Sequence, residues 1–122
     1  MNLRLVARGP ASKYDIWARY VDPQRWPEWS PHLRRVSASG PLRRGLEGEM
    51  EGPLGVRARF DVLEVDRAGG RWSWIVRMGP VRLRIDHEVE EGSAALILVG
   101  SAPAVLAYAP LARRALGSLV AR

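Results

Sequence analysis

The feature that most constrains this chain is a strict alternation of apolar and charged residues between residues 81 and 89. Val81, Leu83, Ile85, His87 and Val89 alternate there with Arg82, Arg84, Asp86 and Glu88. Successive side chains of a strand point to opposite faces of a sheet. The pattern therefore predicts a strand with one buried and one water-facing side, as in a half-buried antiparallel sheet.

The same alternation recurs along the chain between glycine-containing turns. Residues 56–62 and 72–78 repeat it, and a change of phase after Val62 indicates a bulge or bend. Short apolar runs bounded by Gly and Pro are typical of strands. The predicted strands are 2–8, 33–39, 46–51, 55–66, 71–78, 81–91 and 94–100.

Two helices and one short turn complete the predicted elements. Ser12 and Asp15 are spaced as a capping box at the start of a helix that ends before Pro23. The following segment, DPQRWPEWSP (22–31), contains three prolines and allows only one short turn, with Trp26 and Trp29 on the same side. After Ser101 the apolar residues return at helical spacing, and Pro110 predicts a kink or a fresh start there.

These elements define an α+β fold in a single domain, residues 1–122. The order is a strand, a helix, a short helix, six strands and a closing helix. An apolar sheet face must be covered, and the closing helix has a matching apolar stripe. A curved sheet wrapped around one helix would leave space for a cavity between them.

Composition excludes several functions. The chain has no cysteine and only two histidines, so we expect no metal and no other cofactor. Nucleophile-elbow, phosphate-loop, dinucleotide and zinc-protease motifs are missing. The net charge is +6, but the arginines are mixed with acidic residues along the strands. This mixture favours a solvated face over a specific nucleic-acid site.

Targeting and membrane signals are weak. The N-terminus has no apolar run typical of a signal peptide, which predicts a cytoplasmic protein. Residues 93–112 carry no charge, but their glycine, prolines, serines and many alanines favour a strand followed by a helix over a membrane span. We expect a protein that is not transmembrane, as a monomer or homodimer.

The order of elements and several segments resemble the SRPBCC superfamily. This superfamily has the helix-grip fold of START lipid-transfer domains, plant pathogenesis-related allergens and polyketide cyclase/dehydrase-like proteins, and the resemblance is closest to the last group. The segments that carry it are Trp17, VDPQRWPEWSPHLRRV (21–36), GPLRRG (40–45), FDVLEVD (60–66), RWSWIV (71–76), DHEVE (86–90) and PLARRALGSL (110–119). The chain stops soon after Leu119, earlier than is common in the family, which implies a smaller or more open cavity.

The resemblance implies a small hydrophobic ligand, lipid-like or polyketide-like, held between the sheet and the closing helix. The expected ligand-binding residues are Trp29, Phe60, Trp74, Val76, Leu83, Ile85, His87, Val105 and Tyr108. A polyketide aromatase/cyclase-like enzyme is the first alternative, with His87 and Tyr108 as candidate catalytic residues for aldol closure and dehydration. An interaction module that uses the arginine-bearing sheet face is the second. His87 could equally be a neutral core histidine, and the tryptophans could serve packing alone.

Overall fold

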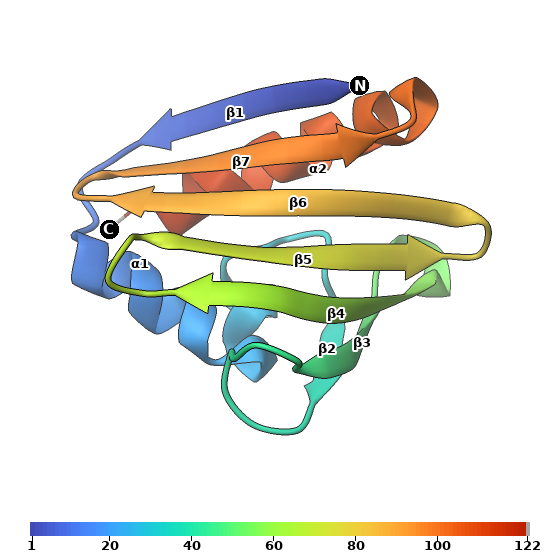
Figure 1. The fold of residues 1–122 in the computed structure, drawn as a ribbon, viewed down its shortest axis with the longest axis horizontal. Helices are drawn as coiled ribbons and strands as arrows, with labels where there is room; N and C mark the ends of the chain where they lie inside the picture. Colours follow the sequence, from blue (N-terminus) through green and yellow to red (C-terminus); the bar gives the residue numbers. More distant parts are fainter. Residues whose placement is uncertain (122) are drawn as a thin grey trace.

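In the computed structural model of the protein, which describes residues 1–121, all seven strands form one antiparallel sheet in the order β1-β7-β6-β5-β4-β3-β2. The strands are β1 (Asn2–Arg8), β2 (Arg35–Ala38), β3 (Glu47–Glu51), β4 (Arg57–Asp66), β5 (Arg71–Met78), β6 (Val81–Glu90) and β7 (Ser93–Gly100). The helices are α1 (Lys13–Val21), the 3₁₀ turns η1 (Pro23–Glu28) and η2 (Pro53–Gly55), and α2 (Ala102–Leu119). Figure 1 shows α1 and α2 on the same side of the sheet.

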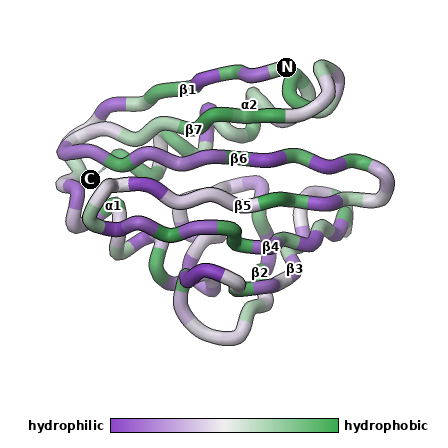
Figure 2. Tube along the Cα trace, in the orientation of Figure 1, coloured by the Kyte–Doolittle hydropathy of each residue, from purple (hydrophilic) through white to green (hydrophobic). Residues whose placement is uncertain are grey.

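The alternation in β6 determines which face the helices cover. Leu83, Ile85, His87 and Val89 are buried, whereas the charged residues between them face outward. Figure 2 shows this alternation of hydrophobic and hydrophilic residues along β6. The change of phase after Val62 is a register shift between Val62 and Glu64 where β4 pairs with β5, as the sequence predicted.

Local capping explains where both helices begin. Ser12 accepts a hydrogen bond from the Asp15 backbone N–H, and the Asp15 carboxylate accepts one from the Ser12 N–H, which completes a capping box. Ser101 caps α2 in the same way through the Ala104 N–H. Pro110 lies inside α2, which continues past it as one helix.

The predicted fold class is confirmed: the protein is an α+β helix-grip fold whose sheet curves around the C-terminal helix. The structure differs from the sequence prediction at the ends of elements. β2 is shorter than the predicted strand 33–39, and η2 occupies the predicted start of β4. Within residues 1–121 no helix combines the length and the apolar character that crossing a bilayer requires.

Candidate ligand-binding site

An aromatic cluster fills one end of the space between the sheet and the helices. Trp26, from η1, is 1% exposed and lies 5.4, 6.0 and 5.2 Å (between ring centroids) from Phe60, Trp72 and Trp74 of β4 and β5. Its indole Nε1–H donates to the Tyr20 carbonyl over 3.0 Å. The proline-rich segment thus inserts Trp26 into the core, where it joins α1 to the sheet.

Trp29 has a different environment from Trp26. It is half-buried, its ring lies edge-to-face with Tyr20 at 5.5 Å, and its Nε1–H donates to the Arg19 carbonyl over 3.3 Å. Both of these contacts are to residues of α1. Trp29 therefore holds η1 against α1, and it also lines the inner chamber described below.

His87 is a buried titratable side chain within this aromatic cluster. It is 4% exposed, and its ring stacks on Trp72 with 3.5 Å between centroids and 7° between planes. Its Nδ1 lies 3.0 Å from the Trp72 carbonyl oxygen, which can only accept, so Nδ1 carries the proton and Nε2 is an acceptor. Burial lowers the pKa of His87 to about 3, against a smaller opposing effect of this hydrogen bond. The imidazole is neutral at physiological pH.

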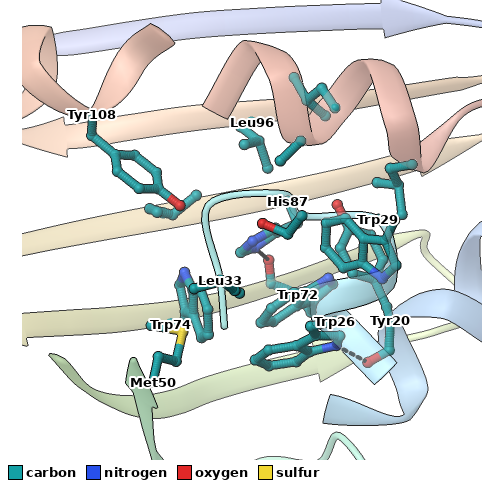
Figure 3. A pocket seen from close by; sticks show the side chains of 15 residues that line it. Tyr20, Trp26, Trp29, Leu33, Met50, Trp72, Trp74, His87, Leu96 and Tyr108 are labelled. Carbon is teal, nitrogen blue, oxygen red and sulfur yellow. Dashed lines mark hydrogen bonds between the residues drawn. The ribbon is translucent and has the colours of Figure 1, made fainter. Parts of the chain in front are cut away.

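Next to this cluster is an inner chamber of about 40 Å³ (Figure 3). A single buried water needs roughly 10–15 Å³ of cavity volume. The chamber therefore has room for a few waters or one small chemical group. Figure 3 shows Tyr108 reaching from α2 toward the sheet on one side, with His87 and Trp29 on the other. The lining residues are Tyr20, Trp26, Trp29, Ser30, Leu33, Met50, Trp72, Trp74, Ile85, His87, Leu96, Tyr108, Ala115, Leu116 and Leu119.

A larger outer pocket of about 350 Å³ opens beside the inner chamber, between the sheet, η2 and α2. Its wall is almost entirely apolar, and its size falls within the range of small-molecule sites. Leu54 of η2 stands at its edge, 95% exposed and with a positive φ of 59°. The lining residues are His32, Leu33, Met50, Gly52, Pro53, Leu54, Val56, Ala58, Val76, Met78, Val81, Leu83, Ile85, Tyr108 and Leu111.

The residues expected at the ligand site divide between these two spaces. Trp29, Trp74 and His87 line the inner chamber, Val76 and Leu83 line the outer pocket, and Ile85 and Tyr108 line both. Phe60 and Val105 line neither, although both point inward. Phe60 packs against Trp26 and Trp74, and Val105 is fully buried in the core.

The structure adds site residues that the sequence pattern did not single out. His32, which follows Pro31 in a loop, is half-buried, and its ring lies edge-to-face with the Tyr108 ring at 5.8 Å between centroids. Met50 and Leu33 line both spaces. The inward position of Met50 on β3 could have been found from its alternation with Glu49 and Glu51, whereas the loop residues carry no comparable periodic signal.

The buried neutral state of His87 leads to a pH-dependent stability. The unfolded chain's imidazole takes up a proton below about pH 6.5, whereas the folded imidazole does so only near pH 3, so stability decreases as the pH falls through this range. Between about pH 7 and 5, above most carboxylate titration, we expect a loss of about 2 kcal/mol in the free energy of unfolding from this group.

Urea unfolding of the wild type and His87→Gln at both pH values measures this effect. The variant is expected to lose most of the pH dependence. His32→Gln serves as the control, because His32 is only partly buried and its pKa is lowered less. An unchanged pH dependence in His87→Gln would contradict the buried neutral state.

The fold and the two adjoining spaces define a helix-grip protein with an apolar cavity between the sheet and its C-terminal helix. The family model described as "Polyketide cyclase / dehydrase and lipid transport" matches residues 6–122, so the chain belongs to that family, within the SRPBCC superfamily. A comparison with curated proteins found no match.

Solved structures show the same fold at low sequence identity. DynU16, a protein of the dynemicin biosynthetic locus, is 16% identical with a TM-score of 0.76; the match covers 98% of this chain but 45% of DynU16. The Zhui aromatase/cyclase from Streptomyces sp. R1128 is 10% identical with a TM-score of 0.75, and 98% and 91% of the two chains are covered. Ara h 8.0201 is 8% identical with a TM-score of 0.73, with coverage of 98% and 95%.

Proposed function

We propose that this protein binds a small apolar or aromatic molecule, lipid-like or polyketide-like, in the outer pocket between the sheet and α2. The observation that carries the proposal is the apolar opening of about 350 Å³ lined by aliphatic side chains of β4, β5, β6 and α2. Burial of apolar surface from water stabilises such a complex by about 25 cal/mol per Å². Membership of a cyclase and lipid-transport family supports a ligand of this chemistry.

Binding is favoured over catalysis by the acid–base properties of the two candidate catalytic residues. Efficient proton transfer needs a group whose pKa lies near the working pH. Burial instead lowers the pKa of His87 to about 3 and raises that of Tyr108 to about 12. Neither group is matched to the enolisation and dehydration steps that aldol cyclisation would require at neutral pH.

The alternative of a basic interaction face is less well supported. Outward-facing arginines of the sheet form ion pairs with neighbouring carboxylates: Arg4 with Glu88, Arg59 with Glu49, Arg77 with Asp61, and Arg84 with Asp86. Exposed pairs of this kind are individually weak and typical of solvated surfaces. They reduce the positive charge that an anionic partner would meet.

Thermal unfolding with a panel of linear and bicyclic apolar compounds tests the proposal. A ligand present at a hundred times its Kd adds about 2.7 kcal/mol to the stability of the folded state, which should raise Tm by several degrees. A naphthalene disulfonate, equal in ring size but charged, serves as the control and is expected to leave Tm unchanged. If no apolar compound raises Tm, the proposed function is wrong.

A further inference from the structure

Two hydrogen-bond donors at the inner chamber have no partner. The indole Nε1–H groups of Trp72 and Trp74 are buried and make no hydrogen bond within residues 1–121. Both tryptophans line the chamber. Buried donors without partners are rare in folded proteins, and a donor that lines a chamber can be satisfied by a water or a ligand group inside it.

Trp74 is the better placed of the two donors. Trp72 stacks on His87 and lies edge-to-face with Tyr20 at 5.1 Å between centroids, so aromatic rings surround it. In Figure 3 the indole nitrogen of Trp74 lies at the end of the ring nearer to Tyr108. Trp17 also has an unpartnered indole N–H, but it lines neither the chamber nor the outer pocket.

The other polar groups of the chamber are uncharged. His87 is neutral and leaves Nε2 as an acceptor, and the phenols of Tyr108 and Tyr20 are protonated at neutral pH, as tyrosines ordinarily are, with burial raising both pKa values further. None of the side chains that line the chamber carries a charge at neutral pH. An anionic group entering here would lose its hydration without gaining a counter-charge, which is strongly unfavourable.

The chamber adjoins the outer pocket. Four residues line both spaces: Leu33, Met50, Ile85 and Tyr108. These side chains separate a molecule in the outer pocket from the chamber. Met50 and Leu33 can change rotamer, and methionine is especially adaptable. At about 40 Å³ the chamber has room for a carbonyl or hydroxyl group with its carbon but not for a ring.

From these observations we infer that the inner chamber holds an uncharged oxygen-bearing end of the ligand, such as a ketone carbonyl, which accepts a hydrogen bond from the Trp74 indole while the apolar body fills the outer pocket. The inference rests on the proposed function and specifies its ligand class. The carboxylate of a fatty acid and the phosphate of a phospholipid are therefore not expected inside the chamber.

Three probes of nearly equal shape test the inference by calorimetric titration. They are 2-acetylnaphthalene, a ketone; 2-isopropenylnaphthalene, its hydrocarbon counterpart; and 2-naphthoate, its anionic counterpart. We expect the ketone to bind about tenfold more tightly than the hydrocarbon, as one hydrogen bond to an otherwise unpartnered donor would give. The carboxylate should bind more weakly than both.

Variants then locate the hydrogen bond. Trp74→Phe should reduce the ketone-to-hydrocarbon ratio of affinities to about one, whereas Tyr108→Phe should leave it at about tenfold, because the hydrogen bond is assigned to the Trp74 indole. Trp17→Phe removes an equally buried, unpartnered indole N–H outside the chamber and should leave the ratio unchanged. Tyr14→Phe, on the exposed side of α1, is the control for Tyr108→Phe. Both affinities in a ratio are measured on the same variant. A change in the apolar wall affects the ketone and the hydrocarbon alike and therefore cancels in the ratio.

The outcomes separate the two proposals. Equal binding of ketone and hydrocarbon by the wild type, as expected if the chamber holds only water, overturns the inference and leaves the proposed function intact. Tighter binding of 2-naphthoate than of the ketone or the hydrocarbon also overturns the inference. An unchanged ratio in Trp74→Phe overturns the assignment of the donor. If none of the probes binds and no compound of the apolar panel raises Tm, the proposed function is wrong and the inference falls with it. Should Trp74→Phe not fold, the wild-type ratio still tests the inference, and a ratio that falls to about one in Tyr108→Phe would overturn the assignment of the donor to Trp74.

Discussion

Replacing Trp26 with alanine is expected to lower the free energy of unfolding by about 3–5 kcal/mol, the cost of removing a large aromatic side chain from a core. Trp26 is almost fully buried and contacts Phe60, Trp72 and Trp74. Its loss removes these contacts and leaves the Tyr20 carbonyl without its donor. Urea unfolding followed by circular dichroism measures the effect, provided that the transition is two-state.

Two further variants show whether the effect comes from the buried indole. Trp26→Phe keeps an aromatic ring but loses the N–H. Its free energy of unfolding is expected to lie between those of the wild type and the alanine variant. Tyr14→Ala removes an exposed aromatic ring from α1 and should change stability by less than about 0.5 kcal/mol. A loss below about 1 kcal/mol for Trp26→Ala would show that η1 is not anchored through this ring.

Replacing Val76 with tryptophan should weaken apolar ligand binding by about a hundredfold. Val76 lies on β5 between Phe60 and Leu83 in register, and its half-buried side chain lines the outer pocket. An indole at this position would occupy the volume that a ligand ring needs. Burying such a ring contributes about 2–3 kcal/mol, which corresponds to roughly two orders of magnitude in Kd. Titration with 2-acetylnaphthalene measures the change.

The control for this variant makes the same replacement on the other face of the sheet. Val6 of β1 is half-exposed and lines neither the chamber nor the outer pocket. Val6→Trp should therefore leave Kd within about twofold of the wild type. Equal Kd values for Val76→Trp and the wild type would place the ligand outside the outer pocket.

Most of the fold could be predicted from the sequence because its signals are local. Three signals each indicate the backbone conformation of only a few neighbouring residues. They are the alternation in β6, the phase change after Val62 and the capping box at Ser12. They led to the correct order of elements along the chain and to the α+β class, whereas the helix-grip fold was implied by the resemblance to the SRPBCC superfamily. Alternation also placed His87 on the inward face, where it is buried.

The division of the interior into two spaces could not be predicted in this way. Alternation tells which face a side chain is on but not whether its neighbours leave room beside it. Phe60 and Val105 point inward like Val76 and Leu83, yet Trp26 fills the space next to Phe60, and this packing depends on a segment more than thirty residues away. The loop position of His32 beside Tyr108 likewise depends on tertiary packing.

Methyl resonances of the three methionines test the central claim most directly. Met50 lines both the inner chamber and the outer pocket, Met78 lines the outer pocket, and Met1 lines neither. With ¹³C-methyl-methionine and 2-acetylnaphthalene, we expect shifts and intermolecular NOEs at Met50 and Met78, while Met1 stays unchanged. Binding that leaves the Met50 and Met78 methyl resonances in place would contradict a ligand site between the sheet and α2.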